Sequence, residues 1–410
     1  GAKAEFRDSL GRLAYMVGGE IKRNEYLNFT SAKTDYRSSP VGSVVTKGTV
    51  FSDDATDENV EALYGELRFA PVEKWEITAN ARHDRITLDY QAKPVAGNGS
   101  KSMRVDRSFD ANSFRLGASW SGIENTTLFG NVSTGFRVPT VDQLYRGSQT
   151  ISTSVANNPN LKPEKSVNLE FGLRRAFQMM ERDASLQATV FQIDRDDFIL
   201  DTNGQYSGND AQHQSRYENI GGARSRGLEL ALKSSFSPSV DWDLAYTYLD
   251  SYFTRYEHSL QSMGSTYGQP VGSPSCQGLS INWNACYQFI AHNNTGNKVP
   301  RTPPHALNLR SGWRFAEGWK LTGEMDYRDD SWADEINQVK WKGRTIFNMS
   351  LDHARKLPWL GQGARMTAFI KVENVFDRLY YTIARGTNDS QSYSNGFKYD
   401  GVYNAEDLSI

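Results

Sequence analysis

The residues best suited to chemistry in this sequence are its carboxylates and histidines, and their spacing indicates no reactive site. Asp194, Asp196 and Asp197 cluster as calcium ligands do, but the stretch lacks the glycine and the distal glutamate of an EF-hand loop. A solvated strand end accounts for them better. The six histidines are scattered, none forms an HExxH pair, and nothing resembles the turn that presents a nucleophilic serine. We therefore expect no catalytic residue, no metal site, no cofactor and no enzyme.

The composition excludes further classes of protein. Of 410 residues, 38% are hydrophobic, the mean hydropathy is −0.61, and no apolar run approaches the roughly 18 residues of a spanning helix. The 46 Lys and Arg residues against 48 Asp and Glu leave a net charge of −2, so charge gives no reason to expect a nucleic-acid partner. Aromatic residues reach 12%, which favours folded β-structure over disorder.

Most of the chain alternates apolar and polar residues, which is the two-residue period of a β-strand. In 62–70, for example, Leu63 and Leu67 share one face while Glu66 and Arg68 share the other. The alternation predicts about 14 strands, many of them roughly 10 to 14 residues long. That length is close to the roughly 9 to 11 residues with which a tilted strand crosses a bilayer.

The links between these strands alternate between short and long. Short links are expected at 9–11, 71–74, 122–125, 178–182, 237–240, 316–318 and 356–364. Long links are expected at 26–57, 92–107, 138–163, 201–215, 255–301, 330–338 and 378–410. This rhythm predicts an all-β fold, an antiparallel up-and-down transmembrane β-barrel with tight turns at one rim. An aromatic girdle at that rim is expected from Trp75, Trp120, Trp242, Trp313 and Trp319.

Three stretches carry motifs that point to a family. They are LFGNVSTGFRVPTVDQLY (128–145) with NNPNLKPEKSVNLEFGLR (157–174), NIGGARSRGLELAL (219–232), and FIKVENVFDRLYYT (369–382). Together they resemble the TonB-dependent outer-membrane receptors, which import ferric siderophores, haem and cobalamin. The stretches follow the family's order, and the resemblance covers nearly the whole chain. We expect most of these motif residues to build the barrel rather than to touch a substrate.

The resemblance implies a domain arrangement, a location and partners. Family members are barrels of about 22 strands that are filled by an N-terminal plug. Residues 1–410 would then form one receptor barrel domain, a fragment without the plug, the TonB box, about seven first strands and the closing strand. The expected location is the outer membrane of a Gram-negative bacterium, among outer-membrane lipid and lipopolysaccharide. The expected energy source is the TonB–ExbB–ExbD complex, acting through the plug region.

The resemblance also implies a ligand that is held by the outer loops. Aromatic rings together with Arg or Lys suit a ferric siderophore, which presents flat organic faces and commonly a negative charge. Candidates chosen by their position in the long loops are Tyr145, Arg146, Tyr267, Trp283, Tyr287 and Trp332. For each of them, packing within its own loop or in the girdle is the alternative.

Three other functions stay open. Haem receptors typically carry a histidine between the two motifs of the first stretch, and residues 140–156 contain none, although His213, His258 or His292 could ligate haem from other loops. A passive porin would share the barrel and the girdle but would need no energy-coupling partner. A soluble carbohydrate-binding β-protein would bury the apolar strand faces in a sandwich of two sheets.

The two cysteines lie in the longest expected loop. Cys276 and Cys286 would face the oxidising exterior in the expected topology. We expect a disulfide between them, which closes a short loop and contributes roughly 2–3 kcal/mol to local order. Two unpaired loop cysteines are the alternative.

Overall fold

The structure is a computed structural model of the chain, and it describes most of the residues. The described residues are 1–37, 44–93, 103–145, 156–202, 216–256, 259–263, 288–337, 340–361, 363–380, 384–386, 393–394, 397–398 and 402–404. Short helical segments are α1 at Val141–Tyr145 and a 3-10 turn at Pro358–Leu360. Within these described ranges, no helix is both long enough and apolar enough to cross a bilayer.

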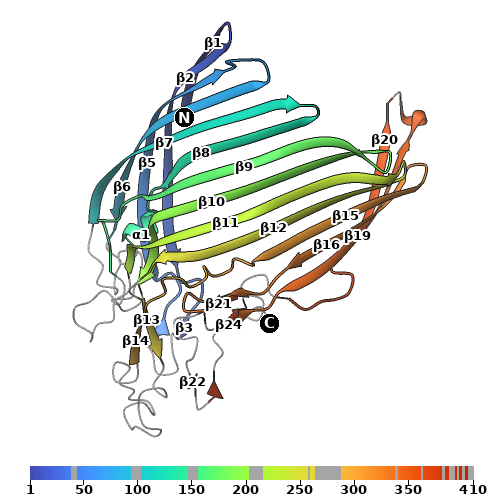
Figure 1. Ribbon diagram of the computed structural model, residues 1–410. Coiled ribbons are helices and arrows are strands. Elements are labelled where there is room, and N and C mark those ends of the chain that lie inside the picture. Colours follow the sequence, from blue (N-terminus) through green and yellow to red (C-terminus); the bar gives the residue numbers. More distant parts are fainter. Residues whose placement is uncertain are drawn as a thin grey trace.

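The long strands form one antiparallel 14-stranded sheet, in which each strand pairs with the next long strand along the chain. They are β1 (Ala2–Leu10), β2 (Leu13–Ser31), β5 (Val50–Phe69), β6 (Trp75–Ala92), β7 (Met103–Ile123), β8 (Thr126–Arg137), β9 (Glu164–Met179), β10 (Arg182–Thr202), β11 (Arg216–Ser237), β12 (Val240–Arg255), β15 (His305–Ala316), β16 (Trp319–Arg328), β19 (Arg344–Lys356) and β20 (Arg365–Val372). Figure 1 shows a single strongly curved sheet with β1 and β20 at its two edges. The expected all-β, up-and-down topology is confirmed.

Short strand pairs lie in the connections between the long strands and after β20. They are β3 (Tyr36–Arg37) with β4 (Val44–Val45), β13 (Ser259–Met263) with β14 (Gln288–His292), β17 (Ser331–Trp332) with β18 (Lys340–Trp341), β21 (Ala384–Gly386) with β24 (Val402–Asn404), and β22 (Tyr393–Ser394) with β23 (Phe397–Lys398). Figure 1 shows β3, β13, β14, β21 and β24 gathered beyond one end of the long strands. We call that end of the sheet the long-loop end.

Tight turns and long connections alternate around the sheet, as the sequence predicts. Short links join β1 to β2, β5 to β6, β7 to β8, β9 to β10, β11 to β12, β15 to β16 and β19 to β20. In Figure 1 these links lie along the top and the right side of the sheet, opposite the long-loop end. Several of them contain a residue with positive φ, such as Gly11 at 59°, Asn125 at 54° and Gly318 at 74°, which is the backbone that tight hairpins need.

Tryptophans gather at this short-turn rim, as expected. Trp75 begins β6, and its ring centroid lies 6.2 Å from that of Trp120 in β7. Trp242 stacks on Phe236 at 5.6 Å, and Trp313 continues the row farther round the sheet. Such a row of amphipathic rings is typical of the surface of a bilayer.

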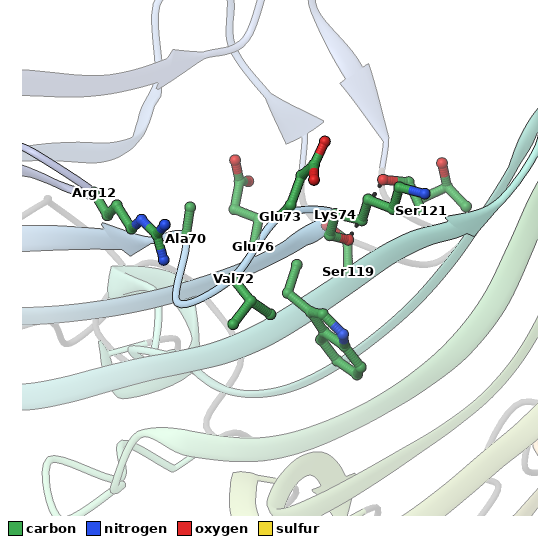
Figure 2. A pocket seen from close by; sticks show the side chains of 10 residues that line it. Arg12, Ala70, Val72, Glu73, Lys74, Glu76, Ser119 and Ser121 are labelled. Atoms are coloured by element: carbon green, nitrogen blue, oxygen red, sulfur yellow. Dashed lines mark hydrogen bonds between the residues drawn. The ribbon is translucent and has the colours of Figure 1, made fainter.

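A hollow of about 530 Å³ opens beside the turn between β5 and β6. Figure 2 shows Val72, Glu73 and Lys74 of the turn on one side of it, with Ser121 of β7 close to Lys74. The Ser121 amide donates to the Lys74 carbonyl at 2.9 Å. This hollow lies at the short-turn rim, at the far end of the strands from the long connections.

The two faces of the sheet differ in polarity along the half of the strands near the short turns. A hollow of about 410 Å³ is lined by one face of β5 to β11, which is therefore the concave inner face. Its lining includes Arg68, Asn80, Arg115, Glu170 and Arg174. The opposite face exposes apolar side chains, including Leu63, Leu67, Phe114, Leu116 and Phe171. Polar inside and apolar outside is the pattern of a barrel that contacts lipid.

The polarity pattern reverses in the half of the strands near the long-loop end. In β7, Leu116 is 54% exposed, whereas Phe109 is an odd number of residues away, points to the opposite face and is 4% exposed. In β12, Tyr248 is 40% exposed and Phe253, on the opposite face, is 1% exposed. The reversal marks the level at which the outer face stops meeting lipid and meets water instead.

The reversal also explains why the strands are longer than the sequence analysis expects. The alternation suggests roughly 10 to 14 residues, but β2, β5, β7 and β11 contain 19, 20, 21 and 22 residues. Because the apolar positions change from one face to the other, each strand reads as two segments that are out of phase. The expected long link at 26–57 therefore includes the end of β2 and the beginning of β5.

A charge placed on the outer face should distinguish the two halves of β7. Leu116→Arg puts a guanidinium into the apolar band midway between Trp120 and the reversal, and we expect a loss of about 2–4 kcal/mol in the free energy of unfolding. Ser108→Arg places the same group on the same face beyond the reversal, where we expect a change within about 0.5 kcal/mol. Urea unfolding in lipid vesicles measures both. Equal losses for the two variants would contradict the proposed boundary.

Candidate functional site

An apolar cluster lies on the inner face at the long-loop end, and we call it the mouth cluster. It consists of Ile86, Leu88, Tyr90, Ala92, Phe109, Leu144, Tyr145, Leu161 and Ile199. Strands β6 and β7 supply one side of it, and the connection between β8 and β9 covers that side with α1 and Leu161. The cluster therefore fixes a segment of the long connection against the inner wall of the sheet.

The helix α1 is short, and its first turn is closed by two side chains. The Gln143 amide donates to the Thr140 hydroxyl at 3.3 Å, and the Thr140 amide donates to the Gln143 side-chain oxygen at 3.1 Å. This reciprocal pair is a capping box, which satisfies amides that have no partner within the helix. A helix of this length is not stable alone, so burial of Leu144 and Tyr145 must hold it in place.

Tyr145 joins α1 to the wall of the sheet. Its ring stacks on Tyr90, with ring centroids 4.7 Å apart and planes 1° apart. The Tyr90 hydroxyl donates to Asp54 at 3.0 Å, and the side-chain amide of Asn28 donates to the other carboxylate oxygen at 3.2 Å. Burial raises the pKa of Asp54 above its ordinary value, and these two hydrogen bonds oppose the rise.

Arg137 and Glu164 join the ends of β8 and β9 at the base of the long connection. The guanidinium donates to both carboxylate oxygens, at 2.8 and 2.6 Å, and Glu164 also accepts the Ile199 amide at 2.9 Å. The hydrogen bonds from Arg137 to Glu164 raise the pKa of Arg137. A two-point contact between a guanidinium and a carboxylate fixes both position and orientation. Three strands, β8, β9 and β10, are thus tied at one carboxylate.

Asparagine side chains tie the same connection to β11. The side-chain oxygen of Asn219 accepts a hydrogen bond from the Lys162 amide at 2.8 Å, and its side-chain NH2 donates to the Lys162 carbonyl at 2.9 Å. The side chain thus forms the two hydrogen bonds that the main chain of a neighbouring strand would form. Asn158 donates to the Tyr217 carbonyl at 2.8 Å. Asn158 and Lys162 belong to one motif stretch (157–174) and Asn219 to another (219–232), and the fold brings these two stretches together.

A second inner-face cluster lies farther round the sheet, and it consists of Ala223, Phe253 and Tyr256. The chain that returns to β15 packs there and is tied to the next connection. Asn337 accepts the Lys298 amide and donates to the Lys298 carbonyl at 2.9 Å, in the same two-way manner as Asn219. The Arg301 amide donates to the Trp332 carbonyl at 2.8 Å. Two adjacent connections are therefore held together at their bases.

The structure places two of the candidate ligand residues. Tyr145 is fully buried in the mouth cluster, and its hydroxyl has no hydrogen-bond partner. Trp332 is half-buried in β17, with the Lys340 ammonium 5.2 Å from its ring centroid. The two residues belong to different parts of the long-loop end. Arg146, Tyr267, Trp283 and Tyr287 lie outside the described residues, as do Cys276 and Cys286, so these assignments and the disulfide stay predictions.

The sequence does not predict the part of the inner face that lies at the long-loop end. Tyr90, Phe109 and Arg107 lie on this face at the long-loop end, in stretches that border or fall within an expected loop. The signal that could have found them is the change of phase in 84–92, where apolar residues move from odd to even positions. Among the residues with described side chains, no group of three or more His, Cys, Asp or Glu is placed to hold a metal ion.

Replacing Glu164 should loosen the base of the connection. Glu164→Gln keeps an oxygen for the Ile199 amide but loses the charge-assisted bonds from the partly exposed Arg137, so we expect a loss of about 1–2 kcal/mol. Hydrogen exchange of 137–164 and urea unfolding measure it. Lys165→Gln, exposed on the opposite face of β9, is the matched control. Unchanged protection in Glu164→Gln would show that the ion pair does not hold the segment.

Replacing Asp54 should change how stability depends on pH. Because the folded pKa is raised, this carboxyl favours folding fully below its unfolded pKa of about 3.9, and the contribution is lost as the pH rises through the folded value. Asp54→Asn should therefore be more stable than the wild type at neutral pH, with the difference shrinking on acidification. Unfolding at a series of pH values measures it, with Asp53→Asn as the charge control on the other face. A variant less stable at neutral pH would refute this.

Comparison with known proteins extends these observations. The family model described as "TonB dependent receptor-like, beta-barrel" matches residues 2–375. The chain is 21% identical over 290 residues to a probable TonB-dependent siderophore receptor, PiuA, of Acinetobacter baumannii, which covers 70% of this chain and 33% of the relative. It is 30% identical over 135 residues to a hemin receptor of Yersinia enterocolitica, which covers 28% of this chain and 20% of the relative.

A solved structure has the same fold. The ferric citrate transporter FecA in its unliganded form aligns with a TM-score of 0.63 at 18% identity, covering 98% of this chain and 51% of that chain. The chain thus spans about half the length of that transporter, and the matches to the two curated relatives cover 33% and 20% of their lengths. The family consists of outer-membrane receptors and transporters and is not an enzyme family. Since the model of the family's β-barrel matches nearly the whole chain, this chain belongs to the TonB-dependent receptor family.

Proposed function

We propose that the whole protein is a receptor in the outer membrane of a Gram-negative bacterium that takes up a ferric siderophore in a TonB-dependent manner. The observation that carries the proposal is the family match over residues 2–375, and the sheet has the polar inner face and the apolar outer band of such a barrel. A relative named as a siderophore receptor and a structure named as a ferric citrate transporter support the same substrate class.

The hydrogen bonds at the base of the long connections favour ligand binding in this proposal. Glu164, Asn219 and Asn337 tie neighbouring connections together, so side chains on those connections need less ordering when a ligand arrives. The ligand-contacting residues in this proposal are Tyr145, Arg146, Tyr267, Trp283, Tyr287 and Trp332. Energy would come from the TonB–ExbB–ExbD complex, and the apolar outer band would contact membrane lipid and lipopolysaccharide.

Haem is the second candidate substrate. The match to a hemin receptor at 30% identity favours it, although it covers only 28% of this chain. Residues 140–156 contain no histidine, so an iron ligand would have to come from elsewhere. A siderophore therefore remains the first candidate.

Uptake by whole cells tests the proposal. Cells that carry the full-length gene should grow on, and accumulate radioactive iron from, at least one ferric siderophore in a panel that also contains haem. The same cells without TonB should lose this uptake, because a plugged barrel needs energy to pass its ligand. The matched control is a strain without the receptor gene but with TonB.

Each alternative has its own outcome in this experiment. Uptake that is unchanged without TonB would refute the receptor and favour a passive porin. TonB-dependent growth on haem alone would refute the siderophore and favour the second candidate. Binding of haem by the purified protein, followed by its absorption spectrum, would then report an iron–histidine bond.

A further inference from the structure

The apolar band on the outer face ends in one row of residues on β10, β11 and β12, which lie side by side in the sheet (Figure 1). Val190 pairs with Leu228, and Leu228 pairs with Tyr248. Val190 and Tyr248 are both exposed, as side chains that meet lipid must be. We call these three residues the last apolar row. Polar residues follow on the same face toward the long-loop end, because every second residue of a strand shares its face.

Three cations lie on the outer face just beyond the last apolar row. In the next row of this face Arg226 pairs with Asp250, and one row farther Arg224 pairs with Tyr252. Lys298, in the chain that returns to β15, forms an isolated bridge with Tyr252 and so lies on the same face. The Arg224, Arg226 and Lys298 side chains are 37%, 57% and 51% exposed, so a ligand can reach all three. We call them the outer cation patch.

Two carboxylates hold the outer cation patch in place but do not neutralise it. One Asp250 oxygen lies 3.1 Å from the Arg226 guanidinium, and the other oxygen pairs with the Lys298 ammonium. Asp194 accepts the Nε of Arg224 at 2.5 Å. Three cations and two carboxylates leave one positive charge uncompensated within this group. Each guanidinium has five N–H donors, so these contacts leave donors for a further acceptor.

The ring of Tyr252 lies close to two of the cations. The guanidinium carbon of Arg226 is 5.9 Å from the ring centroid, and the Lys298 ammonium is 5.8 Å from it. Attraction between the cations and the ring limits the freedom of two long side chains. Because Lys298 belongs to a connection and Arg226 to a strand, a ligand that binds both also ties that connection to the sheet.

The level of the patch in the membrane indicates the ligand. In outer-membrane barrels the short turns face the periplasm and the long connections face the outside of the cell. The outer cation patch therefore lies at the headgroups of the outer leaflet, with the last apolar row beside the acyl chains. The lipid of that leaflet in a Gram-negative bacterium is lipopolysaccharide, whose anchor carries phosphate groups directly above its acyl chains. Guanidinium and ammonium groups bind phosphate oxygens through charge-assisted hydrogen bonds.

We propose that the outer cation patch binds a phosphate group of lipopolysaccharide, and that the acyl chains of the same molecule lie against the last apolar row. The inference rests on the outer-membrane location in the proposed function, and it assigns the lipid contact to a specific site. A bound lipid spans β11, β12 and the chain before β15, so it also stabilises the base of that connection.

Lipid binding by the purified full-length receptor in detergent tests the site. The probes are lipid A, the same lipid A with its phosphates removed, and phosphatidylglycerol as a different anionic lipid. A titration followed by native mass spectrometry gives a dissociation constant for each. We expect lipid A to bind roughly tenfold more tightly than either of the other two probes, because only lipid A offers both the phosphates and the acyl chains in the proposed arrangement. Lipid A should also raise the melting temperature.

Two variants and two controls locate the effect. Arg226→Gln and Lys298→Gln should each weaken lipid A binding roughly fivefold, the contribution of one basic side chain at a lipid surface. Lys298→Arg keeps the charge and should keep the binding. Lys233→Gln removes an exposed charge from the inner face of β11, and it should leave the constant unchanged. A purely structural effect would instead lower the melting temperature of the lipid-free protein and weaken binding of the dephosphorylated lipid equally.

The outcomes separate this inference from the proposed function, because the lipid assay needs neither substrate nor TonB. Equal binding of lipid A with and without its phosphates would overturn the site, and so would lipid A binding that neither Arg226→Gln nor Lys298→Gln weakens. Phosphatidylglycerol that binds as tightly as lipid A would overturn lipopolysaccharide as the occupant. Each of these results leaves the uptake proposal standing, whereas uptake that does not depend on TonB would refute the proposed function and spare the lipid site.

Discussion

A strand that crosses a bilayer must show lipid an apolar face, and beyond the bilayer it must show water a polar one. The rest of this structure depends on that constraint. Along β7 the exposed Leu116 and the buried Phe109 lie on opposite faces, and β12 repeats the change with Tyr248 and Phe253. Past the reversal, the inner face becomes apolar and needs cover. The connection between β8 and β9 supplies that cover with α1 and Leu161.

Covering the inner face also fixes the connections that would hold a ligand. Glu164 ties β8, β9 and β10, and Asn219 and Asn337 replace missing strand edges with their side-chain amides. A carboxylate or amide can do this because it satisfies main-chain groups that a loop would otherwise leave without partners. Loops with fixed bases present their side chains in few arrangements, which favours tight recognition of a scarce ligand.

The sequence predicts the order of short and long links, because turns and alternation are local signals. It predicts the girdle for the same reason, since Trp75 and Trp120 lie next to turns that can be read directly. The strand ends that the sequence predicts are wrong. Beyond Ala81 the apolar residues move to the other face of the strand, and on the first face alone this change looks like the end of the strand. Tyr90 and Phe109 of the mouth cluster are not predicted by the sequence because they border the expected loop at 92–107.

The sequence by itself determined the fold class, the family and the alternation of turns and loops, since each follows from composition, period or contiguous motifs. Only the tertiary structure decided which motif residues meet. Arg137 and Glu164 form hydrogen bonds because the long connection between them brings its two ends together. Tyr145 follows β8 and stacks on Tyr90 of β6, although β7 lies between these two strands. Contacts between residues so far apart in the chain depend on register and curvature, which no local pattern specifies. For that reason Tyr145, which is expected to be a loop residue, lies buried against Tyr90 of the wall.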